Sequence, residues 1–385
     1  MSVRIGIVGA SASGIYAALL CAHKHKDATI VVFDRADKVG KKLLATGNGH
    51  CNLMHVPLVS GAFNHPEFVQ NLLDTVGEKR VFDTLKQLGI LTMEKDGLLY
   101  PLSYSAASHV RFLSESMKHA GIEVRLNEAI TGIEGQTLFT KTGRYEFDEI
   151  IFAFGGKSQS NLGSNGSLFP MLQKLGYKVT ETRPSLCPIK SPDVDGCLFG
   201  VRHPALVRLE KAGKALYEEA GEVQFKDDAL SGIAVMNASS KFEPGCEIVL
   251  DLFPNIDEAE LAKSIYESRN AFGPSFLDPI LGKELVEYVL KKEKISANEP
   301  LNLPKCRHIA RFLKEMRFRC SGLYGFESSQ VTRGGIALEE VDKTLTSKRD
   351  CHHHFIGECL DIDGLCGGYN LGFALLSAIV AVDSL

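Results

Sequence analysis

The first residues that could do chemistry form a short turn rich in glycine and serine, Gly9-Ala-Ser-Ala-Ser-Gly14. Such a turn lets the backbone approach a pyrophosphate, whose charge then lies at the amino end of the following helix. Gly9 permits the tight turn, and Gly14 permits close packing of the helix. Ser11 stands where the dinucleotide pattern has its middle glycine, and serine is small and can donate a hydrogen bond. The turn therefore predicts a nucleotide phosphate site.

An acidic residue follows at the spacing that such a site requires. Asp34 lies 20 residues after Gly14, at the end of the apolar run 29–33, where a carboxylate would bind the adenosine ribose hydroxyls. Residues 4–8 predict a strand and residues 15–25 a helix, so strand, turn, helix and strand follow within about 30 residues. This context favours a dinucleotide site over an ordinary turn of an α/β domain.

A second glycine-rich loop spans residues 41–52, Lys-Lys-Leu-Leu-Ala-Thr-Gly-Asn-Gly-His-Cys-Asn. Lys41 and Lys42 next to a flexible glycine turn suit a loop that lies along a phosphate or a flavin ring. The alternative is a solvated surface loop. Cys51 is a candidate redox thiol beside a flavin, although no partner cysteine is near in sequence and packing is the alternative.

The C-terminal run carries the strongest signal. A strand starting at Phe355 ends in Gly357-Glu358, and Gly367-Gly-Tyr-Asn370 precedes an apolar helix. Flavoproteins with two-part nucleotide domains use such an acid to bind the ribityl chain. The helix would then point its amino end at the flavin pyrimidine, where negative charge develops on reduction. We expect the paired glycines to let backbone amides approach the flavin, because glycine there has no structural advantage in a helix.

A further strand at 149–154 runs into Gly155-Gly156 and completes the set of glycine turns. No catalytic residue and no metal ligand is predicted; Cys351-His-His-His354 is an unconvincing metal cluster, since adjacent residues of a strand point to opposite faces. The candidate cofactor-binding residues are Gly9, Ser11, Ser13, Gly14, Asp34, Lys41, Lys42, Gly49, Cys51, Asn52, Gly155, Gly156, Gly357, Glu358, Asp363, Gly367, Gly368, Tyr369 and Asn370.

The elements that must position these residues are interrupted by an insert. After Pro184, short strand-like runs with several prolines predict a small barrel or sandwich, and from Asp257 the hydrophobic period becomes helical. We predict an α/β fold in which a discontinuous Rossmann-like FAD/NAD(P)-binding domain carries inserted β-barrel and small helical domains. The expected boundaries are 1–185 and 331–385 for the FAD-binding domain, 186–255 and 317–330 for the barrel, and 256–316 for the helices.

At these motifs the chain resembles a known family. The segments 331–336, 346–348, 357–364 and 367–370, with the loops at 9–14 and 41–52, look like the bacterial BaiN/YhiN-type NAD(P)/FAD-dependent oxidoreductases, also called aminoacetone-oxidase-type flavoproteins. The resemblance covers nearly the whole chain. It implies non-covalently bound FAD in a domain interrupted by a β-barrel and a small helical domain.

The chain departs from the family's usual pattern at several positions. Ser11 replaces a glycine of the first loop, and Asn48 and His50 stand where the second loop usually has glycine and arginine. The run 163–167 lacks the usual aspartate, and Ile233 replaces a proline. The family's arginine contact to a phosphate or flavin is therefore missing from the second loop.

Composition limits the function classes. The chain has 385 residues, of which 44% are hydrophobic and 23% charged, with a net charge of −4, so the basic surface typical of nucleic-acid binding is not expected. No run reaches the ~18–20 apolar residues that cross a bilayer, no secretory signal is apparent, and ten scattered cysteines suit reduced thiols. We therefore expect a cytoplasmic protein with a small-molecule substrate and no membrane or nucleic-acid partner; the oligomeric state is not predicted.

The predicted function is that of an FAD-dependent oxidoreductase. The flavin would take a hydride, plausibly from transiently bound NAD(P)H, and pass it to a small organic acceptor or to oxygen. Two alternatives stay open: a flavin-dependent RNA-modifying protein that binds RNA through the insert, and a flavin-binding module without turnover.

Overall fold

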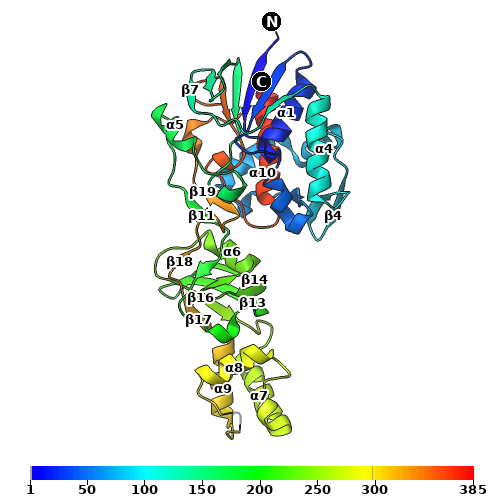
Figure 1. Cartoon of the computed structure of the whole chain (residues 1–385). Coiled ribbons are helices and arrows are strands. Elements are labelled where there is room, and N and C mark those ends of the chain that lie inside the picture. The colour runs from blue at the N-terminus through cyan, green and yellow to red at the C-terminus, as the bar shows by residue number, and fades with distance from the viewer. Residues whose placement is uncertain (1, 297) are drawn as a thin grey trace. The chain divides into compact units, whose positions relative to one another are not determined.

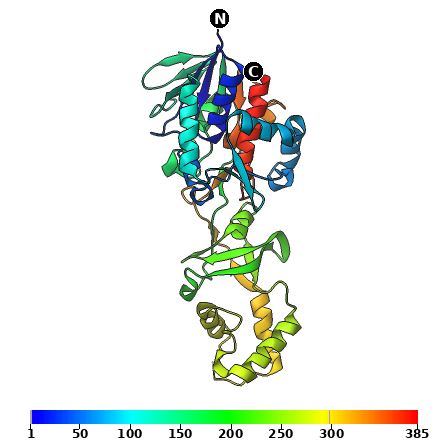
Figure 2. The same ribbon diagram turned by 90° about the vertical axis from the view of Figure 1, so that its right-hand side faces the viewer.

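The computed structural model describes residues 2–296 and 298–385. The chain divides into two units: unit 1 is Met1–Pro184 with Ser329–Leu385, and unit 2 is Ser185–Ser328 (Figure 1). In unit 1, the chain's first strands (blue) and its last helix (red) lie together (Figure 2). The C-terminal segment thus completes a domain that the N-terminal segment begins.

Unit 1 is built on a five-stranded parallel sheet. Its strand order is β20-β10-β1-β2-β6, with bounds His353–Phe355, Glu149–Phe152, Arg4–Val8, Thr29–Phe33 and Glu123–Arg125. Every neighbouring pair runs parallel, with registers such as Val8 opposite both Phe33 and Phe152. The four apolar residues after Arg4 are buried, as expected for a strand covered on both faces.

Two helices that begin at the same end of this sheet pack together. Helix α1 (Ala12–Lys24) follows β1, and α10 (Tyr369–Ser384) ends the chain. Almost all the apolar residues of both helices are buried. The other helices of unit 1 are α2 (Pro66–Val76), α3 (Glu78–Gln87), α4 (Ala106–His119) and α5 (Phe169–Lys174). Small accessory sheets are formed by β3 (Met54–His55), β5 (Leu98–Pro101) and β4 (Thr92–Lys95), by β7 (Gly132–Glu134), β8 (Thr137–Phe139) and β9 (Arg144–Glu146), and by β11 (Arg183–Ser185) with β19 (Val331–Arg333).

Unit 2 contains a curled antiparallel sheet. The strand order is β17-β16-β13-β14-β15-β12-β18, with bounds Met316–Arg319, Cys246–Asp251, Arg202–Lys211, Lys214–Phe225, Ala229–Ser231, Ile189–Lys190 and Gly322–Leu323. The two edge strands β17 and β18 are consecutive in the chain, so the sheet curls until its edges are joined through residues 320–321. The Cys320 amide donates to the Cys246 carbonyl, and the Ser321 amide donates to the Lys190 carbonyl. The predicted barrel is thus present.

The helices of unit 2 share the core of the barrel. Helix α6 (Ile233–Ser239) follows β15, while α7 (Glu258–Phe272), α8 (Lys283–Lys292) and α9 (Leu303–Lys314) are inserted between β16 and β17. Asp257 caps α7 by accepting from the Glu260 amide, and Asn302 caps α9 by accepting from the Lys305 amide. Barrel and helix residues form one hydrophobic cluster. No helix in the described parts of the chain is both long and apolar enough to span a bilayer.

Candidate functional site

The site predicted from sequence lies at one edge of the parallel sheet. Because neighbouring strands run in the same direction, the loops that follow β20, β10, β1 and β2 emerge at the same edge. These loops carry Gly357-Glu358, Gly155-Gly156, Gly9–Gly14 and Asp34. Four chain segments thus meet at the edge where open α/β sheets bind their ligands.

The first loop is held by contacts that leave no room for side chains. Gly9 has φ +116°, and a Cβ there would lie 2.3 Å from the Ala153 carbonyl oxygen; a Cβ on Gly14 would lie 1.9 Å from the Gly9 carbonyl oxygen. Ser11 is the N-cap of α1, its side chain makes no capping hydrogen bond, and the first turn has no acidic residue. The first-turn amides therefore present positive potential to an anion.

Asp34 is tied to this loop by its carboxylate. Oδ2 accepts from the Ala10 amide and Oδ1 from the Ala36 amide, both at 2.7 Å. Each oxygen has a second lone pair, so the carboxylate keeps the capacity to accept from ribose hydroxyls.

The two lysines of the second loop point to different partners. Lys41 pairs with Asp37 four residues before it, at 3.2 Å and largely in solvent. The ammonium of Lys42 lies 2.8 Å from Glu358 Oε2, and both side chains are less than one-fifth exposed. Of these two candidates, only Lys42 reaches the sheet edge.

Beyond Lys42 the loop adopts left-handed backbone at several residues. Gly47, Asn48, Gly49 and Cys51 have φ between +51° and +87°, and Asn48 and Gly49 are exposed. The Cys51 side chain is buried, and burial raises its pKa to about 11. It is therefore a neutral thiol at physiological pH, which argues against the redox-thiol hypothesis.

His50 and Asn52 are held by packing within the same loop region. The His50 ring stacks on Tyr104 with centroids 4.0 Å apart, and its Nδ1 lies 3.0 Å from the Tyr104 carbonyl oxygen. A carbonyl only accepts, so Nδ1 carries the proton. A Cβ on Gly47 would lie 3.1 Å from Asn52 Oδ1.

Glu358 is the centre of a polar network that sequence reasoning recognised only in part. Its Oε1 accepts from the Thr332 amide at 2.9 Å. Thr332 Oγ1 accepts from the amides of Lys157 and Ser158, at 2.7 and 3.0 Å. A Cβ on Gly156 would lie 2.4 Å from Thr332 Oγ1 and 2.9 Å from Glu358 Oε1. Thr332 was not predicted as a site residue, although it belongs to the Val331-Thr-Arg-Gly-Gly run that supported the family resemblance.

Gly357 and Ser13 touch one another, because a Cβ on Gly357 would lie 2.5 Å from Ser13 Oγ. The Gly357 amide donates to Ser377 on α10 at 3.0 Å. These contacts pack the loop after β20 directly against α1 and α10.

The residues at the start of α10 have structural partners that the sequence did not suggest. Gly368 has φ +88°, and a Cβ there would lie 2.7 Å from the His55 amide nitrogen on β3. Both polar atoms of the Asn370 amide bond the backbone of Gly364 at 2.9 Å. The expectation that glycine at 368 has no structural reason is therefore wrong, because β3 occupies the space of a side chain.

Tyr369 and Asp363 are both buried beside this turn. The Tyr369 ring stacks on His55 with centroids 4.5 Å apart, and burial raises its pKa. The Asp363 amide donates to Asn64 at 2.9 Å, and its carboxylate lies 3.8 Å from Arg333 Nε. Gly367, with φ +102°, has only side-chain atoms of Leu98 and His55 near the position of a Cβ, at 3.8 and 3.9 Å.

The hydrogen-bonding groups at the sheet edge fit FAD. A helix amino end without an acidic first turn suits the diphosphate, Asp34 suits the adenosine ribose, and Glu358 keeps one unused lone pair on each oxygen for ribityl hydroxyls. The glycines at 9, 14 and 156 keep side chains away from this edge. These groups match what a dinucleotide requires at the carboxyl end of a Rossmann-type sheet.

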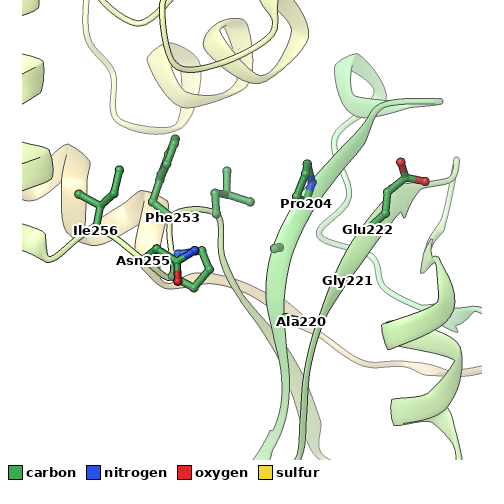
Figure 3. A pocket seen from close by; sticks show the side chains of 10 residues that line it. Pro204, Ala220, Gly221, Glu222, Phe253, Asn255 and Ile256 are labelled. Carbon is green, nitrogen blue, oxygen red and sulfur yellow. The ribbon is translucent and has the colours of Figure 1, made fainter. Parts of the chain in front are cut away.

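A concave surface in unit 2 lies outside the predicted set. Residues after β16 face β13 and β14 across an open cleft (Figure 3). The volume of this cleft is about 510 Å³. Its lining is mainly apolar, and Glu222 contributes a carboxylate at the rim, paired with Arg202. The lining residues are Pro204, Ala205, Ala220, Gly221, Glu222, Leu252, Phe253, Pro254, Asn255 and Ile256.

Comparison with known proteins identifies relatives over the whole length. The family model described as HI0933-like protein Rossmann domain matches residues 3–384. A 3-dehydro-bile acid delta(4,6)-reductase of Clostridium scindens is 30% identical over 98% of each chain. Ribosomal RNA dihydrouridine synthases of Haemophilus influenzae and Escherichia coli are each 27% identical over 98% of this chain and 97% of theirs. Similar solved structures include the open conformation of a flavocytochrome c3 fumarate reductase, at 15% identity and a TM-score of 0.48 over 99% of this chain and 78% of that one.

Proposed function

The chain belongs to the HI0933-like Rossmann family of FAD-binding oxidoreductases, and we propose from this premise that it is an FAD-dependent reductase of carbon–carbon double bonds. The meeting of four glycine- or acid-bearing loops at one edge of the parallel sheet carries the choice of FAD as cofactor, and the name of the bile acid reductase relative carries the choice of acceptor. FAD, when bound, supplies the two-electron carbon chemistry.

The chain's own residues bind and orient the cofactor. The first-turn amides of α1 hold the diphosphate, Asp34 accepts the adenosine ribose hydroxyls, and Glu358 accepts hydroxyls of the ribityl chain. Gly9 and Gly14 allow a tight turn with no room for a Cβ, and this turn lets the backbone approach the phosphates. We propose that Asp363, Tyr369 and the turn at Gly367 and Gly368, close to the start of α10, lie beside the flavin.

The acceptor we propose is a double bond conjugated to a carbonyl in a small organic molecule. The activities named for two relatives both reduce such a bond. One acts on the double bonds at positions 4 and 6 of a 3-oxo bile acid, and the other acts on the 5,6 double bond of uracil. In both molecules the double bond is electron-poor because it is conjugated to a carbonyl. We propose NAD(P)H as the transient reductant and the cytoplasm as the location, where the ten free cysteines would stay reduced.

A second candidate acceptor is a uridine in RNA, favoured by a local charge excess in unit 2. Residues 291–319 contain nine lysines and arginines against three glutamates. However, six of these cations pair with carboxylates in the structure: Lys291, Lys305, Lys314, Arg311, Arg317 and Arg319. Paired cations attract phosphates weakly, so we favour the small acceptor.

The test starts with purified protein reconstituted with FAD. Anaerobic addition of NADH or NADPH should bleach the flavin absorbance, and a 3-oxo-4-ene steroid or 2-cyclohexen-1-one should restore it with formation of the saturated ketone. Failure to take up FAD, or bleached flavin that reoxidises only with oxygen, would contradict the proposal. Dihydrouridine formed in an added ribosomal RNA transcript, without turnover of either ketone, would favour the RNA candidate.

A further inference from the structure

The adjacent residues Lys41 and Lys42 have different surroundings. The Lys41 ammonium lies 3.2 Å from Asp37, with one-third of its side chain and over half of that of Asp37 exposed. Lys42 reaches Glu358 at 2.8 Å, with 18% and 19% of the two side chains exposed. Water screens an exposed i,i+4 pair strongly, whereas a mostly buried pair interacts more strongly. The two lysines therefore have separate roles.

The carboxylate that Lys42 binds is held from the opposite side as well. Glu358 Oε1 accepts from the Thr332 amide at 2.9 Å. Thr332 is itself fixed by Ser158, whose amide donates to Thr332 Oγ1 at 3.0 Å and whose hydroxyl lies 2.7 Å from that of Ser329. Gly156 lies so close that a Cβ would be 2.9 Å from Oε1. Segments that are up to 316 residues apart thus meet at one carboxylate.

The negative charge of Glu358 must be balanced by a nearby positive charge, because this carboxylate lies where we propose that FAD binds. A carboxylate that is mostly withdrawn from water is costly unless it is paired and hydrogen-bonded. Lys42 supplies the compensating charge from one side only. One lone pair on each Glu358 oxygen is then left to accept hydroxyls.

We propose that Lys42 is a positioning residue that acts on FAD through Glu358: its ammonium orients the carboxylate toward the ribityl chain and offsets its charge. This inference rests on the proposed FAD function. It assigns Lys42 a role different from the phosphate or flavin-ring contact expected from sequence. The Lys42–Glu358 pair joins the second glycine loop to the C-terminal part of the domain.

The experiment is a double-mutant cycle of Lys42→Met and Glu358→Gln, read by the Kd for FAD and by the midpoint potential of bound FAD. We expect each single variant to weaken FAD binding by about tenfold or more, the loss of one charge-assisted contact. The double variant should bind within about twofold of Glu358→Gln alone. Lys42→Met should lower the midpoint potential by more in the parent, where it leaves the Glu358 carboxylate uncompensated, than in the Glu358→Gln background.

Lys41→Met removes the neighbouring charge and serves as the matched comparison, with an expected change in Kd below about threefold. Lys42→Arg keeps the charge and should recover part of the affinity. Should Lys42→Met fail to fold, Lys42→Gln replaces it in the cycle. Losses that multiply in the double variant, or a potential that shifts equally in both backgrounds, would overturn the inference while FAD binding stands. A parent protein that takes up no FAD would overturn the proposed function together with the inference.

Discussion

The two ends of the parallel sheet of unit 1 carry polar groups of different kinds, although β10 and β20 contribute to both ends. At the carboxyl end, glycine loops surround the backbone amides of α1, Asp34 and Glu358. At the amino end, Glu149 faces the histidines that precede or begin β20. The comparison shows which polar clusters suit a ligand and which serve the fold.

Two of the histidines at the amino end, His353 and His354, have both ring nitrogens in hydrogen bonds. His354 bonds Glu149 at 3.0 Å and the Thr346 hydroxyl at 3.1 Å, and His353 bonds the Tyr177 hydroxyl and the Gly135 carbonyl, both at 2.9 Å. A ring nitrogen in a hydrogen bond of this kind offers no lone pair to a metal. His352 and His354 therefore tie the segment around β20 to Glu149 of β10, whereas Asp34 and Glu358 keep lone pairs for hydroxyls.

The largest effect should come from filling the glycine turn at the carboxyl end. A Cβ at residue 14 meets the Gly9 carbonyl oxygen at 1.9 Å, so Gly14→Val forces α1 away from the turn. We expect loss of FAD retention and destabilisation by more than ~3 kcal/mol, measured by flavin content and thermal unfolding. Gly61→Ala is the control, because a Cβ at residue 61 has no neighbour within 4 Å. A Gly14→Val protein with bound FAD and parental stability would contradict the packing argument.

Asp34→Asn should weaken FAD binding at the same end with a smaller effect on the fold. The amide keeps one acceptor for the Ala10 or Ala36 amide and loses the negative charge toward the ribose. A charge-assisted hydrogen bond contributes roughly 1.5–3 kcal/mol, so we expect a Kd at least tenfold higher in a fluorescence titration. Asp37→Asn, which changes an exposed carboxylate nearby, should leave the Kd within twofold. An unchanged Kd in Asp34→Asn would mean that Asp34 serves only the turn.

Glu149→Gln tests the amino end, where we expect loss of stability without loss of FAD affinity. Burial alone would raise the pKa of Glu149, but hydrogen bonds from His354 and His352 lower it overall. A carboxylate whose pKa is lowered by folding stabilises the fold at pH values above its unfolded-state pKa, which is near 4.5. This stabilisation is lost as the pH falls through the pKa of the folded state. The variant should therefore be about 1–2 kcal/mol less stable at pH 7, with the difference shrinking below about pH 4.5. Glu146→Gln, an exposed neighbour, is the control; a parental stability curve or a changed FAD affinity in Glu149→Gln would refute the distinction between the ends.

The smallest effect concerns two cysteines, one near each end. Cys51 is buried with its pKa raised to about 11, whereas Cys351 is exposed just before the histidines. Because the thiolate is the reactive form, iodoacetamide at pH 7.5 should modify Cys351 at least tenfold faster than Cys51. Peptide mapping by mass spectrometry measures both rates. Early modification of Cys51 in the folded protein would show that the second loop opens readily.

Many of the residues that meet at the carboxyl end of the sheet could be named from sequence because their signals are local. The expected strands at 4–8 and 29–33 are β1 and β2 without change, and α1 starts three residues before and ends one residue before its predicted bounds of 15 and 25. The period of apolar residues sets these elements, and a parallel sheet then brings their carboxyl ends to one edge. The glycine turns at 9–14, 155–156 and 357 could also be predicted, because each directly follows a predicted strand in the sequence.

The tertiary structure decided which of several equivalent residues reaches that edge. Lys41 and Lys42 have the same side chain and neighbouring positions, and only the placement of β20 gives Lys42 a carboxylate 316 residues away. Thr332 joins the site through its backbone amide, which no side-chain pattern reveals. Gly368 is required because β3 lies against it, a contact between segments more than 300 residues apart. Local propensity specifies the elements, whereas contacts of this range depend on how the completed sheet and its loops pack together.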